Sequence, residues 1–394
     1  AEAGALSVHK AKGRLQVLFD QLHGGADLDS TAGVGHTRWA THGAPSDVNS
    51  HPQVSRSGKI AVVHNGIIEN YAELKVFLMN QGVSFTSETD TEVVAQLIEY
   101  FYDGDLLQAV GRVLHRIQGA YALGILCADC PDQIIAVRKD SPLILGYGEG
   151  CNFIASDVTA ILRHTRRVGY MEDGELAVLT REGIQCYNHL MQPIEKEIAT
   201  VDWEIDAAEK GGYEHFMFKE IMEQPDALRR CLSPRIREGD IMFEDLSLSQ
   251  EFLQNMRRIY IVACGSSYHV GMVGKYHLER LTRIPVEVAL GSEFRYMDPI
   301  VDEHTLVIVI SQSGETLDTM AALREARRLG GHILSIVNVV GSSIARESDQ
   351  VLYTWAGPEI AVATTKAYTT QLALLSLLAL WLARQLGTVP EEDC

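Results

Sequence analysis

Basic residues are scarce in this sequence relative to acidic ones. Its 394 residues include 34 Lys and Arg against 52 Asp and Glu, a net charge of −18 at pH 7, and no segment gathers the cations into a stripe. Nucleic-acid binding depends on clustered Lys and Arg that neutralise phosphates. We therefore expect no nucleic-acid partner, and the acidity mainly favours solubility.

Cysteines are few and show no disulfide framework. The seven thiols indicate reduced cysteines in a cytoplasmic protein. Cys127 and Cys130 form a CxxC pair, but no second pair or histidine lies at the spacing of a zinc site. A turn at the end of a strand is the simpler interpretation, and we predict no metal site.

Long apolar runs are also missing. The longest, Leu372 to Ala383, contains a serine and is shorter than the ~20 residues that a membrane-spanning helix needs. We predict that this run forms a buried helix and that the chain has no membrane partner.

The chain is long for one hydrophobic core, so two domains are expected. Over residues 1–205, short apolar runs such as 59–64 and 120–126 alternate with turn residues, which is typical of antiparallel strands. Between them, 93–101 and 106–117 carry apolar residues at helical spacing. Strands with packed helices predict an α+β layered domain.

The pattern changes in the second half of the chain. Residues 206–245 are charged and carry glycine and proline, which predicts a connector. Over 246–394, fully apolar runs at 259–263, 305–310 and 332–337 alternate with helical stretches. This rhythm predicts an α/β domain with a doubly wound parallel sheet.

A loop rich in hydroxyl groups, 311–316, lies between one of these strands and a helix. Ligands of doubly wound sheets bind outside the carboxyl ends of the strands, and a helix N-terminus favours phosphate. The loop has no lysine, so it is not of the Walker type. A plain helix cap is the alternative, but 265–267 occupies the same position after another strand. The sequence thus favours a phosphate site at Ser266, Ser267, Ser311, Gln312, Ser313 and Thr316.

A second candidate site lies near the start of the chain. An α-amino acid needs a cation for its carboxylate and an anion for its ammonium group, and Arg38 and Asp90 could fill these roles. Thr89 and Glu92 flank Asp90 in a capping-box pattern, so Asp90 could instead be a first-turn helix charge. His42 could equally be a structural histidine.

Asn65 and Gly66 follow an apolar strand that we expect to end at His64. A side-chain amide beside a glycine N–H can form an oxyanion hole for acyl transfer. Asn-Gly is also a common hairpin turn, so a simple turn remains the alternative.

Several of these segments together resemble a known family. Segments 263–267, 292–296, 311–316 and 361–366 resemble the first sugar isomerase domain of the glutamine–fructose-6-phosphate aminotransferase family. Three earlier segments resemble the class II glutamine amidotransferase domain of the same family: 35–43, 64–70 and 87–92. The resemblance implies an N-terminal nucleophile hydrolase-type sandwich followed by a sugar isomerase domain.

The resemblance also implies a reaction: glutamine and fructose 6-phosphate give glutamate and glucosamine 6-phosphate, with no metal or organic cofactor, in a homodimer of the full-length protein. It assigns Trp39 to gating ammonia and Asn65 with Gly66 to the oxyanion hole. The residues implied to bind glutamine are Arg38, Thr41, His42 and Asp90. Those implied to bind the sugar phosphate are the six residues of the phosphate site together with Val362 and Thr364.

The sequence departs from the family pattern at both ends. The family's nucleophile is an N-terminal cysteine, whereas position 1 is Ala1 and the first cysteine is Cys127, whose α-nitrogen is held in an amide. The second sugar isomerase domain has no counterpart. We therefore expect a fragment of a longer enzyme that does not turn over by itself. A non-catalytic sugar-phosphate-binding module is the alternative.

Overall fold

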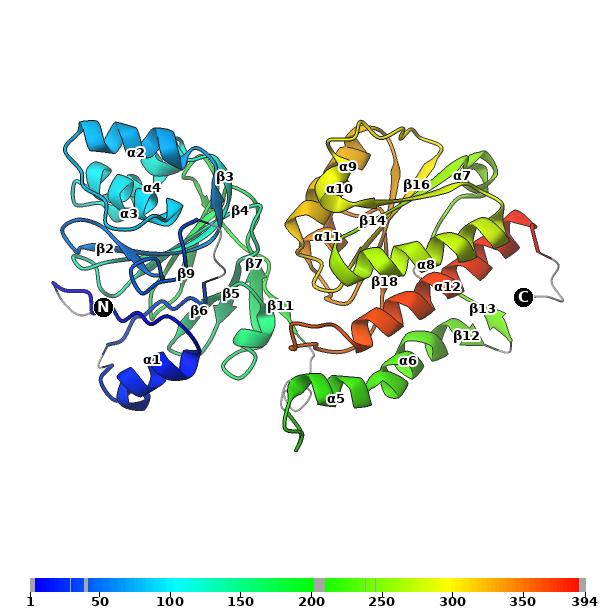
Figure 1. Cartoon of the computed structure of the whole chain (residues 1–394), viewed down its shortest axis with the longest axis horizontal. Coiled ribbons are helices and arrows are strands. Elements are labelled where there is room, and N and C mark those ends of the chain that lie inside the picture. The colour runs from blue at the N-terminus through cyan, green and yellow to red at the C-terminus, as the bar shows by residue number, and fades with distance from the viewer. Residues whose placement is uncertain are drawn as a thin grey trace. The chain divides into compact units, whose positions relative to one another are not determined.

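The computed structural model describes residues 4–28, 30–38, 42–201, 210–237, 239–244 and 246–389. The chain forms two compact units, Ala1–Asp202 and Trp203–Cys394 (Figure 1). The described part of the expected connector, residues 210–237 and 239–244, belongs to the second unit.

The first unit contains two antiparallel sheets. The larger has the order β1-β2-β3-β4-β8-β9-β10, and the smaller has the order β11-β7-β5-β6. The strands of the larger sheet are β1 (Gln53–Val54), β2 (Ile60–Ile68), β3 (Gly119–Cys127), β4 (Ile134–Lys139), β8 (Leu176–Leu179), β9 (Ile184–Tyr187) and β10 (Pro193–Ile194). Those of the smaller sheet are β5 (Ile144–Tyr147), β6 (Asn152–Ala155), β7 (Arg167–Tyr170) and β11 (Ala199–Thr200).

Alternation along the central strands builds two cores. Leu123 and Ile125 of β3 belong to the core beneath the helices, whereas Ala122 belongs to the core that also holds Leu145 of the smaller sheet. Successive side chains of a strand point to opposite faces, so helices cover one face and the second sheet covers the other. The helices on this face are α2 (Tyr71–Asn80), α3 (Asp90–Phe101) and α4 (Leu106–Leu114). This layering confirms the predicted α+β sandwich.

Short elements complete the first unit. They are α1 (Leu15–Gln21), η1 (His23–Gly25) and η2 (Val158–Ala160). The predicted cap of α3 is present, because the Thr89 hydroxyl accepts a hydrogen bond from the Glu92 N–H at 3.3 Å.

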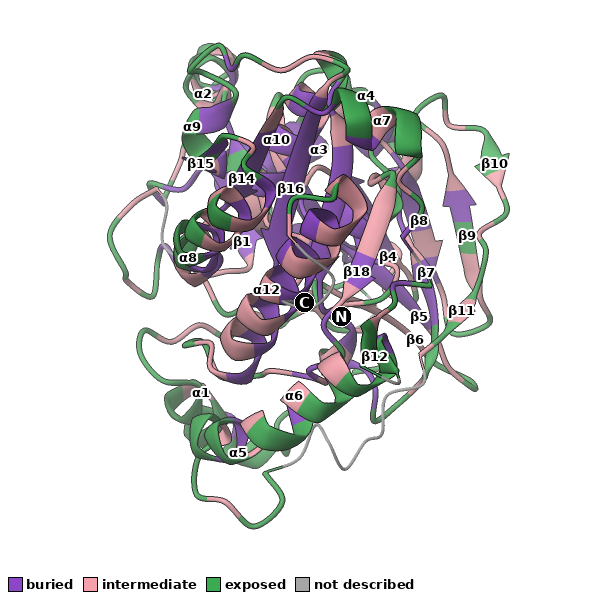
Figure 2. Ribbon diagram, turned by 90° about the vertical axis from the view of Figure 1, so that its right-hand side faces the viewer, coloured by how far each residue is buried: buried purple, intermediate pink, exposed green. Residues whose placement is uncertain are grey.

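The second unit is built on a five-stranded parallel sheet of order β15-β14-β16-β17-β18. Its strands are β14 (Arg258–Ala263), β15 (Val286–Leu290), β16 (Thr305–Ser311), β17 (His332–Val337) and β18 (Gln350–Tyr353). Strand β16 is buried along its whole length (Figure 2). The three predicted strands are confirmed as the middle of this sheet.

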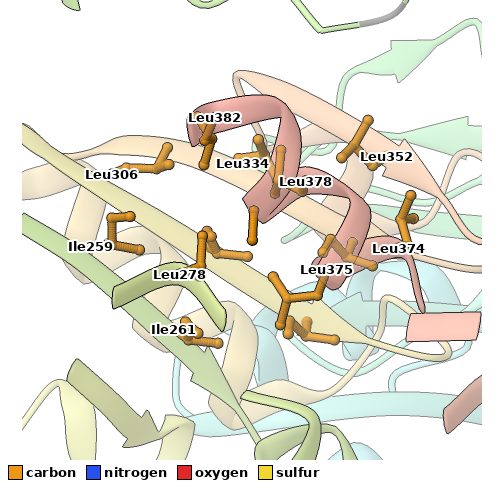
Figure 3. Close-up of a cluster of buried hydrophobic side chains, with 14 of the residues drawn as sticks. Ile259, Ile261, Leu278, Leu306, Leu334, Leu352, Leu374, Leu375, Leu378 and Leu382 are labelled. Atoms are coloured by element: carbon orange, nitrogen blue, oxygen red, sulfur yellow. The ribbon is translucent and has the colours of Figure 1, made fainter. Parts of the chain in front are cut away.

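Helices cover both faces of the parallel sheet. Ile261 and Ile308 pack with Leu278 of α8 (Gly265–Thr282) and Leu378 of α12 (Lys366–Leu386) (Figure 3). On the other face, Val309 packs with α10. The helices on that face are α9 (Gly291–Phe294), α10 (Leu317–Arg328) and α11 (Ser343–Arg346). The predicted doubly wound domain is therefore confirmed.

Helix α12 contains the apolar run at 372–383 that was predicted to be buried. Among the described residues it is the one helix that is long and apolar enough to cross a membrane, yet 61% of the apolar window lies inside the protein. Its leucines belong to the core shown in Figure 3. The run is thus a core helix, as expected.

The remaining elements of the second unit lie before and beside this core. They are α5 (Phe216–Met222), α6 (Gln224–Leu232), η4 (Ser233–Arg235), β12 (Ile236–Arg237), β13 (Asp240–Ile241) and α7 (Gln250–Asn255). Helix α6 packs on α12, and Arg230 donates hydrogen bonds to the carbonyls of Trp355 and Ala356 at 3.2 Å. These contacts explain why the expected connector belongs to the second unit.

Candidate functional site

Asp90 is the centre of a polar cluster in the first unit. It is the first residue of α3 and is buried, and its Oδ2 accepts a hydrogen bond from the Ile68 N–H of β2 at 2.8 Å. Its carboxylate oxygens lie 4.0 Å from Nδ1 of His42 and 3.8 Å from Nδ1 of His64. The structure therefore brings together Asp90 and His42, both singled out from the sequence, and adds His64.

A chain of hydrogen bonds leads away from this cluster. His64 Nδ1 lies 3.0 Å from Thr91 Oγ1, which lies 3.3 Å from His51 Nε2. His51 Nδ1 accepts from the His64 backbone N–H at 3.3 Å. This acceptor role puts the His51 proton on Nε2 when the ring is neutral, so Nε2 donates to the Thr91 hydroxyl.

Both of these histidines are held neutral by their surroundings. Burial lowers the pKa of His51 to about 2, helped by repulsion from His36, His64 and Arg38. Burial also lowers the pKa of His64 to about 4, although the nearby Asp90 acts in the opposite direction. We singled out neither His51 nor His64 as a site residue from the sequence. The one feature of the sequence that could have identified His64 is its position directly before Asn65.

Arg38 supports the loop that carries it. Its guanidinium donates to the carbonyl oxygens of His42 and Gly43, the latter at 3.1 Å. Arginine has five N–H donors, so others remain for the carboxylate of a ligand. Trp39 and Thr41, both predicted site residues of this loop, lie outside the described residues.

A cationic cavity of about 330 Å³ opens beside Arg38. Lys10, Lys12, Arg14 and His36 also line it. Lys10 is half-buried, and this burial lowers the pKa of its ammonium group. An anionic group is the chemistry that such a lining favours.

Asn65 and Gly66 lie inside β2 and not in a turn, so the hairpin-turn interpretation is wrong, as is the expected end of the strand at His64. They pair in register with Ala122 and Tyr121 of β3. Gly66 has φ 131°, and a Cβ there would lie 2.1 Å from the Ala120 carbonyl oxygen. Only glycine fits this backbone.

In the second unit, the two serine-rich segments meet at one edge of the sheet. Strands β14 and β16 are parallel neighbours, and β15 lies on the other side of β14. The chain direction across the sheet therefore reverses at the β14–β16 pair, where doubly wound folds bind ligands. Ser266 and Ser267 begin α8 after β14, and 311–316 leads from β16 to α10.

The loop 311–316 is held by its own hydroxyl groups. Gly314 N–H donates to Ser311 Oγ at 3.0 Å, and Ser311 Oγ lies 3.0 Å from Thr316 Oγ1. The Ser313 hydroxyl accepts from the Glu315 N–H at 3.1 Å. A Cβ on Gly314, which has φ 68°, would lie 2.0 Å from Ser342 Oγ, so the loop passes close against the chain before α11. Gln312 is half-buried in the same loop.

Glu315 lies just before α10 and contacts another helix. Helix α10 begins at Leu317, after its N-cap Thr316. The Glu315 carboxylate accepts from the Ser343 N–H, the first residue of α11, at 2.8 Å. It satisfies a free amide of a neighbouring helix.

The remaining predicted sugar contacts, Val362 and Thr364, lie in the loop before α12. Val362 is 93% exposed. Thr364 donates its hydroxyl hydrogen to Glu359 Oε2 at 2.5 Å. Ser267 is buried and donates to Gln371 Oε1 of α12 at 3.0 Å, which links the phosphate segment to the same helix.

Comparison with known proteins matches each unit to a domain family. Residues 36–163 match the glutamine amidotransferase domain, and residues 252–381 match the SIS domain. The first match contains the Asp90 cluster, and the second contains both serine-rich segments and Val362.

Whole-chain relatives agree with this pair of domains. The glutamine–fructose-6-phosphate aminotransferase [isomerizing] of Caldanaerobacter subterraneus subsp. tengcongensis is 56% identical over 98% of this chain, and that of Clostridium acetobutylicum is 54% identical over 99%. A solved C-terminal domain of glucosamine-fructose-6-phosphate aminotransferase from Francisella tularensis is 40% identical, with 47% of this chain and 52% of that chain covered and a TM-score of 0.45. The chain spans 64% of the length of the two curated relatives. Over nearly its whole length the chain is thus similar to the isomerizing glutamine–fructose-6-phosphate aminotransferases, and it carries a glutamine amidotransferase domain followed by a SIS domain.

Proposed function

We propose that this chain carries the glutamine-binding and phosphosugar-binding sites of an enzyme that transfers the amide nitrogen of glutamine to fructose 6-phosphate. The products are glutamate and glucosamine 6-phosphate. The meeting of 265–267 and 311–316 at the β14–β16 edge is the observation that carries the proposal, because this edge is where such sheets bind phosphorylated ligands. The names of the relatives support the same reaction.

In the first unit, Arg38 would bind the glutamine carboxylate and Asp90 its ammonium group. The buried position of Asp90 strengthens such a charge pair, because solvent screens it less. His42 and Thr41 would complete the glutamine site, and Trp39 would gate ammonia. The Asn65 amide and the Gly66 N–H would stabilise the oxyanion of the acyl-transfer step.

In the second unit, the phosphate would lie against the hydroxyl groups and amides of the two serine-rich segments. Several hydroxyls already bond within the protein, yet each hydroxyl has two acceptor lone pairs and one donor, so these bonds orient it without using all its capacity. Val362 and Thr364 would contact the sugar. The full set of phosphate contacts is Ser266, Ser267, Ser311, Gln312, Ser313 and Thr316.

The reaction needs no metal or organic cofactor, because ammonia adds directly to the carbonyl carbon of the sugar. A cytoplasmic location and a homodimer of the full-length protein are further parts of the proposal. The free cysteines among the described residues suit a reducing compartment.

Titration of the chain with fructose 6-phosphate tests the phosphosugar site. We expect Ser313→Ala to weaken binding by about 1–3 kcal/mol, because a charged acceptor loses one donor. Ser247→Ala is the matched control, since Ser247 is exposed in the same unit and outside both segments. Unchanged affinity of Ser313→Ala in calorimetry would move the phosphate elsewhere.

A further inference from the structure

The loop at 360–365 carries Val362 and Thr364 but has little packing of its own. Val362 is 93% exposed and Ile360 is 37% exposed. Apolar burial therefore does not fix the path of this loop, and its shape must come from contacts at its two ends.

One end of the loop is held by a carboxylate from α5. Oε1 of Glu220 accepts hydrogen bonds from the backbone N–H groups of Ile360 at 2.6 Å and Ala361 at 3.1 Å. Glu220 is only 2% exposed. A buried carboxylate oxygen that accepts two amides fixes both peptide groups in one orientation.

The other end is held by Glu359. Its carboxylate accepts from the N–H groups of Thr365 at 2.8 Å and Ala367 at 3.2 Å, as well as from the Thr364 hydroxyl. Val362 thus lies between two carboxylate anchors. Glu359 is close to the loop in sequence, whereas Glu220 reaches it from about 140 positions earlier.

Buried charges keep the helix of Glu220 in place. Lys366, the first residue of α12, is 2% exposed, and its Nζ lies 2.6 Å from Glu223 Oε2. Nζ of the buried Lys219 lies 3.5 Å from Glu223 Oε1. These two ion pairs meet at Glu223, so they tie the end of α5 to the start of α12.

Burial of the Glu220 carboxylate costs folding free energy. Its second oxygen, Oε2, has no hydrogen-bond partner among the described residues, and an under-bonded buried carboxylate destabilises the fold. A costly group of this kind is expected where function requires it. Glu220 also lies outside both domain matches, which end at 163 and begin again at 252.

We propose that Glu220 is a positioning residue of the phosphosugar site: it holds the peptide groups of 360–361 so that Val362 and Thr364 meet the sugar. This rests on the proposed function of the second unit. The phosphate contacts at 265–267 and 311–316 do not depend on Glu220. The residue therefore acts on the sugar part of the ligand alone.

Calorimetric titration of the whole chain with fructose 6-phosphate and, separately, with inorganic phosphate tests this. Glu220→Met keeps the side-chain volume and removes the acceptor, and we expect the Kd for fructose 6-phosphate to rise at least about tenfold. The Kd for inorganic phosphate should stay unchanged. Glu220→Gln keeps an oxygen at the same reach and should restore most of the affinity.

Two further variants make the result decisive. Glu220→Asp keeps the charge but withdraws the oxygen from the loop. It should therefore also weaken the binding of fructose 6-phosphate and leave that of inorganic phosphate unchanged. This variant replaces Glu220→Met in the test if the latter does not fold. Glu214→Met is the control, because Glu214 is 85% exposed in the same segment. Unchanged fructose 6-phosphate affinity in the Asp and Met variants, or equal losses for both ligands, overturns the positioning role. Failure of the wild-type chain to bind fructose 6-phosphate overturns the proposed function and this role with it.

Discussion

Gly66 illustrates how a single residue is fixed by its neighbours. The sequence singled it out as a partner of Asn65 in an oxyanion hole but left a hairpin turn open. In the structure it is part of β2, with φ 131° and no room for a Cβ beside the Ala120 carbonyl. No local pattern could show this, because the crowding comes from β3, more than fifty residues later.

Gly66→Ala should lower the free energy of unfolding by at least about 2 kcal/mol more than Gly58→Ala. Both glycines have positive φ, 131° and 79°, but a Cβ on Gly58 would meet nothing within 4 Å. Gly58→Ala therefore reports backbone strain alone, about 1–2 kcal/mol. Urea unfolding of the two variants measures the difference. Equal losses would mean that contact with Ala120 does not set the requirement for glycine.

At the scale of elements, histidines join parts of the chain that the sequence separates. His64 of β2, Thr91 of α3 and His51 of the segment before β1 form one hydrogen-bonded chain. A buried histidine with a lowered pKa reduces the free energy of unfolding at any pH where the unfolded chain has taken up its proton and the folded chain has not. This network therefore makes stability depend on pH.

Unfolding free energy should fall as pH drops below 6.5. The unfolded chain takes up a proton at His51 near pH 6.5, whereas the folded chain does not until about pH 2. The unfolded state thus binds more protons in this window, and stability declines by about 1.4 kcal/mol per pH unit for each such histidine. His64, with a folded pKa of about 4, adds to the slope down to that pH.

Urea unfolding at pH 7.5, 6.5 and 5.5 measures this slope. Carboxylates also titrate below this range, so the informative quantity is the difference between the wild type and His51→Gln, which should have the shallower slope. His215→Gln, at an exposed position in the second unit, is the control and should match the wild type. Identical slopes for the wild type and His51→Gln would contradict the neutral, buried state of this ring.

Element type was predictable where local patterns are strong. The apolar strands 259–263, 305–310 and 332–337, and the cap of α3 at Thr89, stand as expected. Features that depend on contact across a long sequence separation were not predictable. Glu315 caps α11 through Ser343, and Glu220 of α5 binds the backbone at 360–361.

At the scale of the whole molecule, the chain has two units and one candidate site in each. Both domain types were predictable, because apolar runs alternate with turn residues in the first half of the chain and with helical stretches in the second. The site residues were found mainly through resemblance. His51, His64 and the Glu220 anchor were missed, since they become neighbours of the site only when the chain folds.

The central claim is that each unit binds its own ligand. Hydrogen–deuterium exchange of the whole chain, with fructose 6-phosphate or with L-glutamine, tests it most directly. Fructose 6-phosphate should slow exchange at 264–268, 311–317 and 360–366, and glutamine should slow it at 36–43, 64–70 and 87–92. Protection by fructose 6-phosphate in the first unit, or none at the β14–β16 edge, would contradict the account.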